Sequence, residues 1–147
     1  MNVAIFCILF ALLLDAAAGC AGAHSQSSGA EGGKLKPCPD RPNCVSSQSE
    51  TARHKIDPFF YSGPPEAAFA RLHKILAARS DTRIITSTPT YLRVEFRTFL
   101  GFVDDGEFYL DAEKMVIHCR SAARLGYWDL GKNRRRMEEI RSRFGRE

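Results

Sequence analysis

The sequence contains no apolar run of the ~20 residues that a helix needs to span a bilayer. Its longest apolar stretch, Val3–Leu14, is shorter and is followed by the small residues Ala16–Gly19. This order is typical of an export signal, although Met1 and Asn2 provide none of the usual lysine or arginine. We therefore predict that residues 1–19 are a signal peptide and that the protein acts on the periplasmic side of a bacterial membrane.

Two kinds of cleavage fit the end of this signal. Ala17-Ala18-Gly19-Cys20 resembles a lipobox, in which the cysteine is acylated and anchors the protein to the membrane. Ala16-Ala17-Ala18 also fits the small-x-small pattern of ordinary signal cleavage. We favour lipidation of Cys20, because a cysteine stands where a lipobox requires one. Residues 20–34, rich in Gly, Ala and Ser, are then expected to form a flexible tether, and residues 35–147 a single domain.

The cysteines lack a second pair at the spacing of a zinc site. Cys38 and Cys44 are separated by five residues that include two prolines. Because an oxidising compartment permits a disulfide, we predict a structural bridge between them and no metal site. Cys119 occupies an apolar position of an alternating strand pattern and is expected to be a buried, inert thiol.

The formal net charge of the chain is +4, which is only mildly basic. Export removes nucleic acid from reach, so anionic headgroups and acidic glycans are the partners that this charge favours. The expected partners are the membrane, through Cys20, and a small anionic ligand or another envelope protein. No cofactor, nucleic-acid partner or particular oligomeric state is indicated.

Hydrophobic periodicity predicts an α+β fold. Leu35–Tyr61 is turn-rich and is expected to be irregular. The predicted elements are helix Pro65–Arg79, strands Thr82–Thr88, Tyr91–Thr98, Val103–Leu110 and Lys114–Ser121, and helix Arg134–Phe144 capped by Asn133. They form an antiparallel sheet of about four strands, with one helix before it and a C-terminal helix packed on it.

Three motifs stand in order along the predicted domain. Pro37–Ser47 has the form Pro-Cys-Pro-x-x-Pro-Asn-Cys-Val-Ser-Ser, and Asp104-Asp105 is an acidic pair in a strand. Arg120–Arg136 combines five arginines with an Asp, an Asn, two glycines and the only Trp. Together they resemble the domain of unknown function family 1499, although Ala123 stands where that family usually has Ser. The resemblance implies a small protein of bacterial envelopes or plastids and implies no activity.

The closing motif suggests two roles for its charged residues. An anion pocket beside a helix N-terminus is one, since arginine forks suit carboxylate or phosphate. Its residues would be Arg120, Ser121, Arg124, Asp129, Asn133 and Arg134. The other is a structural network in which Asp104, Asp105 and Asp129 pair with these arginines and Arg136. We favour the network, because ion-pair networks commonly imitate sites.

A catalytic apparatus is not evident. No Gly-x-Ser-x-Gly nucleophile elbow is present, and the sequence places neither His73 nor His118 beside a serine. Asp104 and Asp105 are adjacent in a strand and point to opposite faces, which argues against a paired-carboxylate mechanism. We therefore expect a non-enzymatic binding or structural module. The alternative is a hydrolase-like enzyme that acts on an anionic substrate at the same corner.

Overall fold

The computed structural model describes residue 30 and residues 32–146. The predicted signal peptide, Cys20 and most of the predicted tether lie outside the described residues. The strands are β1 (Cys44–Ser46), β2 (Phe59–Phe60), β3 (Thr82–Ser87), β4 (Tyr91–Arg97), β5 (Val103–Asp111) and β6 (Val116–Ala123), and the helices are α1 (Pro65–Ala77) and α2 (Lys132–Phe144). No helix among these residues is both long and apolar enough to cross a membrane.

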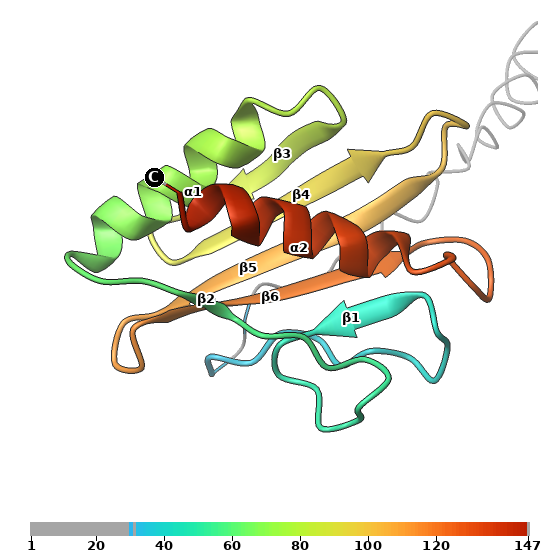
Figure 1. Cartoon of the computed structure of the whole chain (residues 1–147), viewed down its shortest axis with the longest axis horizontal. Coiled ribbons are helices and arrows are strands. Elements are labelled where there is room, and N and C mark those ends of the chain that lie inside the picture. Colours follow the sequence, from blue (N-terminus) through green and yellow to red (C-terminus); the bar gives the residue numbers. More distant parts are fainter. Residues whose placement is uncertain (1–29, 31, 147) are drawn as a thin grey trace, which may run out of the picture.

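The six strands form one antiparallel sheet in the order β1-β6-β5-β4-β3 (Figure 1). Strand β2 also pairs with β6, along the same edge of β6 as β1. The predicted α+β fold and the places of both helices are confirmed. The strand count differs, because β1 and β2 lie in the segment expected to be irregular. Strands of three and two residues are too short to show the period-two alternation that marks a strand in sequence.

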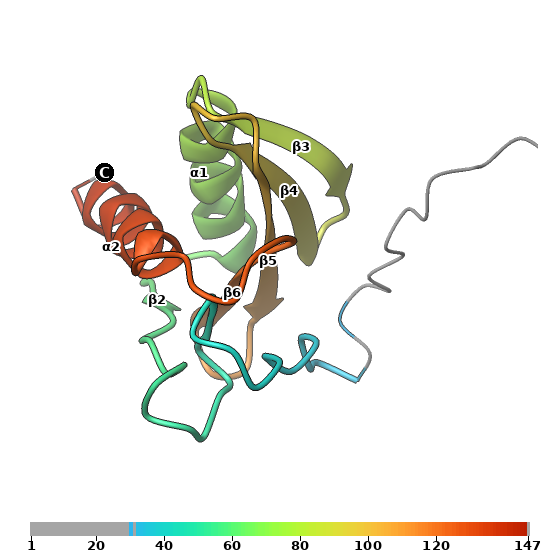
Figure 2. The ribbon, with the colours of Figure 1, turned by 90° about the vertical axis from the view of Figure 1, so that its right-hand side faces the viewer.

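Both helices cover the same face of the sheet (Figure 2). Helix α1 buries the apolar stripe that its spacing predicts, from Ala68 to Leu76, and α2 buries Met137, Ile140 and Phe144. Alternate side chains of the central strands complete this core, with Phe96 and Phe108 fully buried. Burial of these side chains away from water provides the main stabilisation of the fold.

Gly106 lies in the middle of β5, on the core face of the sheet. A Cβ atom at this position would come within 2.8 Å of the Val94 side chain and closer still to the ring of Phe96. Only glycine leaves room for Phe96 to lie across the strand beside it. This close approach explains a glycine that the strand pattern alone would disfavour.

The other face of the sheet is polar. The segment that precedes β1 lies away from the helices (Figure 2), and Gly33 in this segment accepts at its carbonyl from the side-chain amide of Gln48, which follows β1, at 2.8 Å. Gly33 also approaches Tyr109 of β5, so closely that an added Cβ would lie 3.3 Å from the Tyr109 hydroxyl. The end of the predicted tether is therefore packed against the domain.

Candidate functional site

The polar corner is the place where β6 ends, the loop of residues 124–131 turns, and α2 begins. Arg136 of α2 donates to the Asp104 carboxylate of β5 at 2.8 Å, and the two side chains are only 4 % and 5 % exposed. The Arg136 guanidinium also lies 4.5 Å from the centre of the Phe96 ring. A buried charge pair of this kind binds the helix to the sheet at one fixed position.

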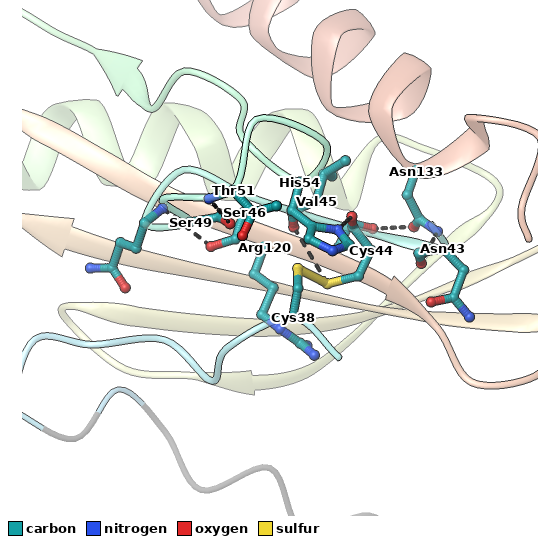
Figure 3. Close-up of a disulfide and its surroundings, with 12 residues drawn as sticks. Cys38, Asn43, Cys44, Val45, Ser46, Ser49, Thr51, His54, Arg120 and Asn133 are labelled. Atoms are coloured by element: carbon teal, nitrogen blue, oxygen red, sulfur yellow. Dashed lines mark hydrogen bonds between the residues drawn. A yellow bond between two sulfur atoms is a disulfide. The ribbon is translucent and has the colours of Figure 1, made fainter. Parts of the chain in front are cut away.

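Hydrogen bonds from side-chain amides connect the polar corner to Asn43, the residue before Cys44 (Figure 3). The Ser121 hydroxyl donates to the Asn133 side-chain oxygen, and the Asn133 amide donates to the Asn43 carbonyl at 3.3 Å. Asn43 in turn donates to the Gly126 carbonyl at 2.6 Å. Since Ser121, Asn133 and Asn43 are all buried, these bonds hold the 124–131 loop against the sheet.

The N-cap residue of α2 is Gly131 rather than the predicted Asn133, and because glycine has no side chain, the first N–H groups of the helix are satisfied by Asp129. Its carboxylate accepts from the backbone N–H groups of Gly131 at 2.9 Å and Asn133 at 2.8 Å. Leu130 and Gly131 adopt positive φ values of 56° and 73°, a conformation that folds the chain back so that the carboxylate meets these groups. The expected pairing of Asp129 with an arginine is therefore wrong: its carboxylate satisfies the helix N-terminus instead.

Arg120 lies on the polar face and points toward Cys38 (Figure 3). It donates at 3.0 Å to Glu107, whose other carboxylate oxygen accepts from the Tyr91 hydroxyl at 2.8 Å. Glu107 is 1 % exposed and was not among the predicted residues. Its pairing with Arg120 was the signal in the sequence, because Glu107 and Arg120 stand directly opposite each other in an antiparallel hairpin.

Arg124 pairs with two carboxylates on the polar face. It donates to Asp105 at 2.8 and 2.9 Å and to Glu95 at 2.6 Å, and Arg93 reaches Asp105 at 3.3 Å. Burial raises the pKa of the Asp105 carboxyl, but the hydrogen bonds and charge of Arg124, with the charge of Arg93, outweigh burial and hold that pKa below its ordinary value. Asp105 is thus ionised and locked between two strands.

The six residues predicted to bind an anion do not share one pocket. Because side chains alternate along β6, Arg120 and Arg124 lie on the polar face while Ser121 lies under α2. Arg134 extends elsewhere and donates to the carbonyls of Arg53 and Lys55 at 2.9 and 2.8 Å. Each guanidinium of the corner, that of Arg136 included, donates to a carboxylate or a carbonyl, so the geometry is that of a rigid scaffold.

A groove of about 510 Å³ lies beside this scaffold. It runs between the loop of residues 98–102, which joins β4 to β5, and the loop of residues 124–131. Its apolar lining comes from Phe99, Leu100, Phe102, Leu125, Trp128 and Leu130. Periodicity could not reveal it, because these side chains lie outside any helix or strand. The signal available in the sequence was large apolar residues in loops that ordinarily carry polar ones.

The disulfide predicted between Cys38 and Cys44 is confirmed. Cys119 is free and buried, and burial raises the pKa of its thiol to about 12. A thiol with so high a pKa supplies almost no thiolate at neutral pH, so Cys119 is chemically inert in the folded protein.

Ser47, His118 and Asp111 lie in a row that the sequence did not predict, with a hydrogen bond between the first two only. The Ser47 hydroxyl lies 3.2 Å from His118 Nδ1, and His118 Nε2 lies 3.6 Å from an Asp111 oxygen. Burial lowers the pKa of His118, which keeps the ring neutral at pH 7. However, the Ser47 oxygen also accepts from the Cys119 N–H at 2.9 Å, and Ser47 is only 7 % exposed. This serine therefore secures the end of β1 against β6 and does not present a nucleophile.

Among residues 30 and 32–146, no three or more His, Cys, Asp or Glu side chains gather in a way that could hold a metal ion. The site thus consists of a two-layer α+β scaffold, a fixed arginine–aspartate corner and an apolar groove beside it.

The model of one protein family, described as protein of unknown function (DUF1499), matches residues 34–144. The chain belongs to this family. No curated protein and no solved structure gave a significant match.

Proposed function

We propose that the protein is a non-enzymatic binding module on the periplasmic side of a bacterial membrane, exported through residues 1–19 and anchored by a lipid on Cys20. The disulfide between Cys38 and Cys44 carries this proposal, because such bonds persist in oxidising compartments and are rare in the cytosol. The polar corner then serves as the rigid support that fixes the 124–131 loop for binding.

The anchor is tested by mass spectrometry of the protein recovered from membranes. We expect the chain to begin at Cys20 and to carry diacylglycerol, and Cys20→Ser to move the protein into the soluble fraction. Cys7→Ser is the matched control, since Cys7 lies within the predicted signal and is discarded with it. A full-length chain that retains residues 1–19 and has reduced Cys38 and Cys44 would contradict the proposal.

Arg124 is the corner residue that a small anionic ligand would contact. Its side chain is 35 % exposed, whereas those of Arg120 and Arg136 are 8 % and 4 % exposed. Binding would have to compete with Asp105 and Glu95, which already accept from this guanidinium. Thermal unfolding with and without inorganic phosphate tests the idea: phosphate should raise the Tm of the natural chain and leave Arg124→Gln unchanged. Equal shifts in both proteins would place the anion elsewhere.

The alternative of a hydrolase-like enzyme at the same corner has less support. Ser121 is the serine of the corner, and it is fully buried with its hydroxyl bonded to Asn133. A nucleophile needs both a base within reach and access to substrate. The binding module is therefore the function that the geometry favours.

A further inference from the structure

One end of the molecule carries large apolar side chains that no part of the described chain covers. The loops of residues 98–102 and 124–131 lie together at this end, on the right in Figure 1, and border the same groove. Seven of their side chains are at least half exposed, and we call them the loop-tip surface: Phe99, Leu100, Phe102, Leu125, Tyr127, Trp128 and Leu130. Phe99 is fully exposed. Large apolar side chains gathered at one exposed place mark an interaction surface.

The composition of the loop-tip surface suits a membrane interface. Trp128 and Tyr127 each combine an aromatic body with one polar group, and such rings concentrate where hydrocarbon meets headgroups. The leucines and phenylalanines that accompany them supply the apolar area that drives insertion. Two protruding loops can enter lipid together without a complementary protein surface.

The charges around the loop-tip surface complement anionic headgroups. Arg97, Lys132 and Arg135 are exposed beside it, and none has a carboxylate partner among residues 30 and 32–146. The two carboxylates that line the groove are occupied internally, because Asp104 is buried against Arg136 and Asp129 accepts from the N–H groups at the start of α2. Basic residues at a bilayer surface are attracted to the negative charge of anionic lipid.

The two loops are held in place before any contact is made. In the first, the Phe102 N–H donates to the Thr98 hydroxyl at 3.0 Å and the Gly101 N–H donates to the Thr98 carbonyl at 2.9 Å. In the loop of residues 124–131, the Asn43 side-chain amide donates a hydrogen bond to the Gly126 carbonyl. Fixed loops lose little conformational freedom when they bind, which favours association.

We propose that the loop-tip surface inserts into the boundary between headgroups and acyl chains of an anionic phospholipid bilayer. The idea rests on the proposed function for the presence of that membrane, and it adds a second, non-covalent contact to the lipid on Cys20. Membrane attachment by two signals is stronger and more stable than attachment by one acyl chain alone. The domain would then lie against the bilayer with its β4–β5 and β6–α2 loops facing the lipid.

Trp128 allows a direct test, because it is the only tryptophan in the chain. The full chain is mixed with vesicles of phosphatidylglycerol and phosphatidylcholine whose acyl chains carry bromine, which quenches tryptophan near it. We expect the Trp128 emission to move to shorter wavelength and to be quenched. Both effects should weaken with phosphatidylcholine vesicles alone and at high salt, since salt screens the basic residues.

Matched variants connect the signal to the surface. Phe99→Ser combined with Leu100→Ser should weaken vesicle binding of the Cys20→Ser chain by about ten-fold or more, from the apolar area lost. Phe60→Ser is the control, because Phe60 is 69 % exposed on β2, outside the loop-tip surface, and its loss should change nothing.

The outcomes separate this inference from the anchor. Vesicle binding through an acylated Cys20 with an unchanged Trp128 spectrum would overturn the inference and leave the proposed function intact. A spectral shift in Cys20→Ser equal to that of the natural chain supports the inference without the anchor. If the Trp128 emission shifts with protein concentration in the absence of lipid, and sedimentation shows a dimer, the loop-tip surface binds a second copy of the chain. That result would overturn the inference.

Discussion

Arg136 and Asp104 join helix α2 to strand β5 through a buried hydrogen-bonded ion pair of 2.8 Å. Asp104 lines the groove together with Trp128, and Arg136 also donates to Asn133 at 3.1 Å. Because Asn133 contacts both Ser121 and Asp129, one arginine connects the sheet, the helix and the loop. The position of the loop-tip surface thus depends on this pair.

Removing one member of the pair should be costly. Asp104→Ala or Arg136→Ala leaves an uncompensated buried charge, and we expect each to lower the free energy of unfolding by about 3–5 kcal/mol. The double variant should cost less than the sum, because neither charge then remains alone. Urea denaturation of the four proteins checks this cycle, and strictly additive losses would contradict the coupling.

Gly106 should not tolerate a side chain. Gly106→Ala would force the added methyl group into the Phe96 ring and Val94, and we expect a loss of about 1–3 kcal/mol in unfolding free energy. Gly63→Ala has open space around its Cβ but a φ of 82°, so its effect reports backbone strain alone. Adding Phe96→Leu to Gly106→Ala should restore part of the loss, which thermal unfolding would detect.

The Cys38–Cys44 disulfide closes a short loop over the polar face. Replacing both cysteines with serine should lower the free energy of unfolding by about 2 kcal/mol, because a loop of this length restricts the unfolded chain only modestly. A reducing agent should lower the Tm of the natural protein and have no effect on the variant. Equal sensitivity of both proteins to reduction would contradict the assignment.

Asp105 should make stability depend on pH in the acid range. Its pKa is lowered in the folded state, so between that pKa and the ordinary value the unfolded chain binds more protons. The stabilisation is therefore complete at neutral pH and is lost as pH falls through the folded pKa. Asp105→Asn should cost about 1 kcal/mol at pH 7 and make the decline below pH 4 shallower.

The candidate site was only partly visible in the sequence. The motif around Arg120–Arg136 identified the corner, and strand alternation correctly placed Asp104 and Asp105 on opposite faces. The same alternation puts Arg120 and Ser121 on opposite faces of β6, which argues against a single pocket that holds both. Glu107 was missed because a fully buried carboxylate is rare and its partner stands across a hairpin.

Periodicity and motifs by themselves determined the α+β class, both helices, the four long strands, the disulfide and the family. These features follow from local spacing, since the apolar faces of helices and strands are fixed by their own geometry. Only the tertiary structure decided which groups meet: Asp129 at the helix N–H groups, Arg136 against Asp104, and two loops that together form an apolar end. Those contacts join residues distant in sequence, and the register of strands and packing of helices select them from many equally possible pairs.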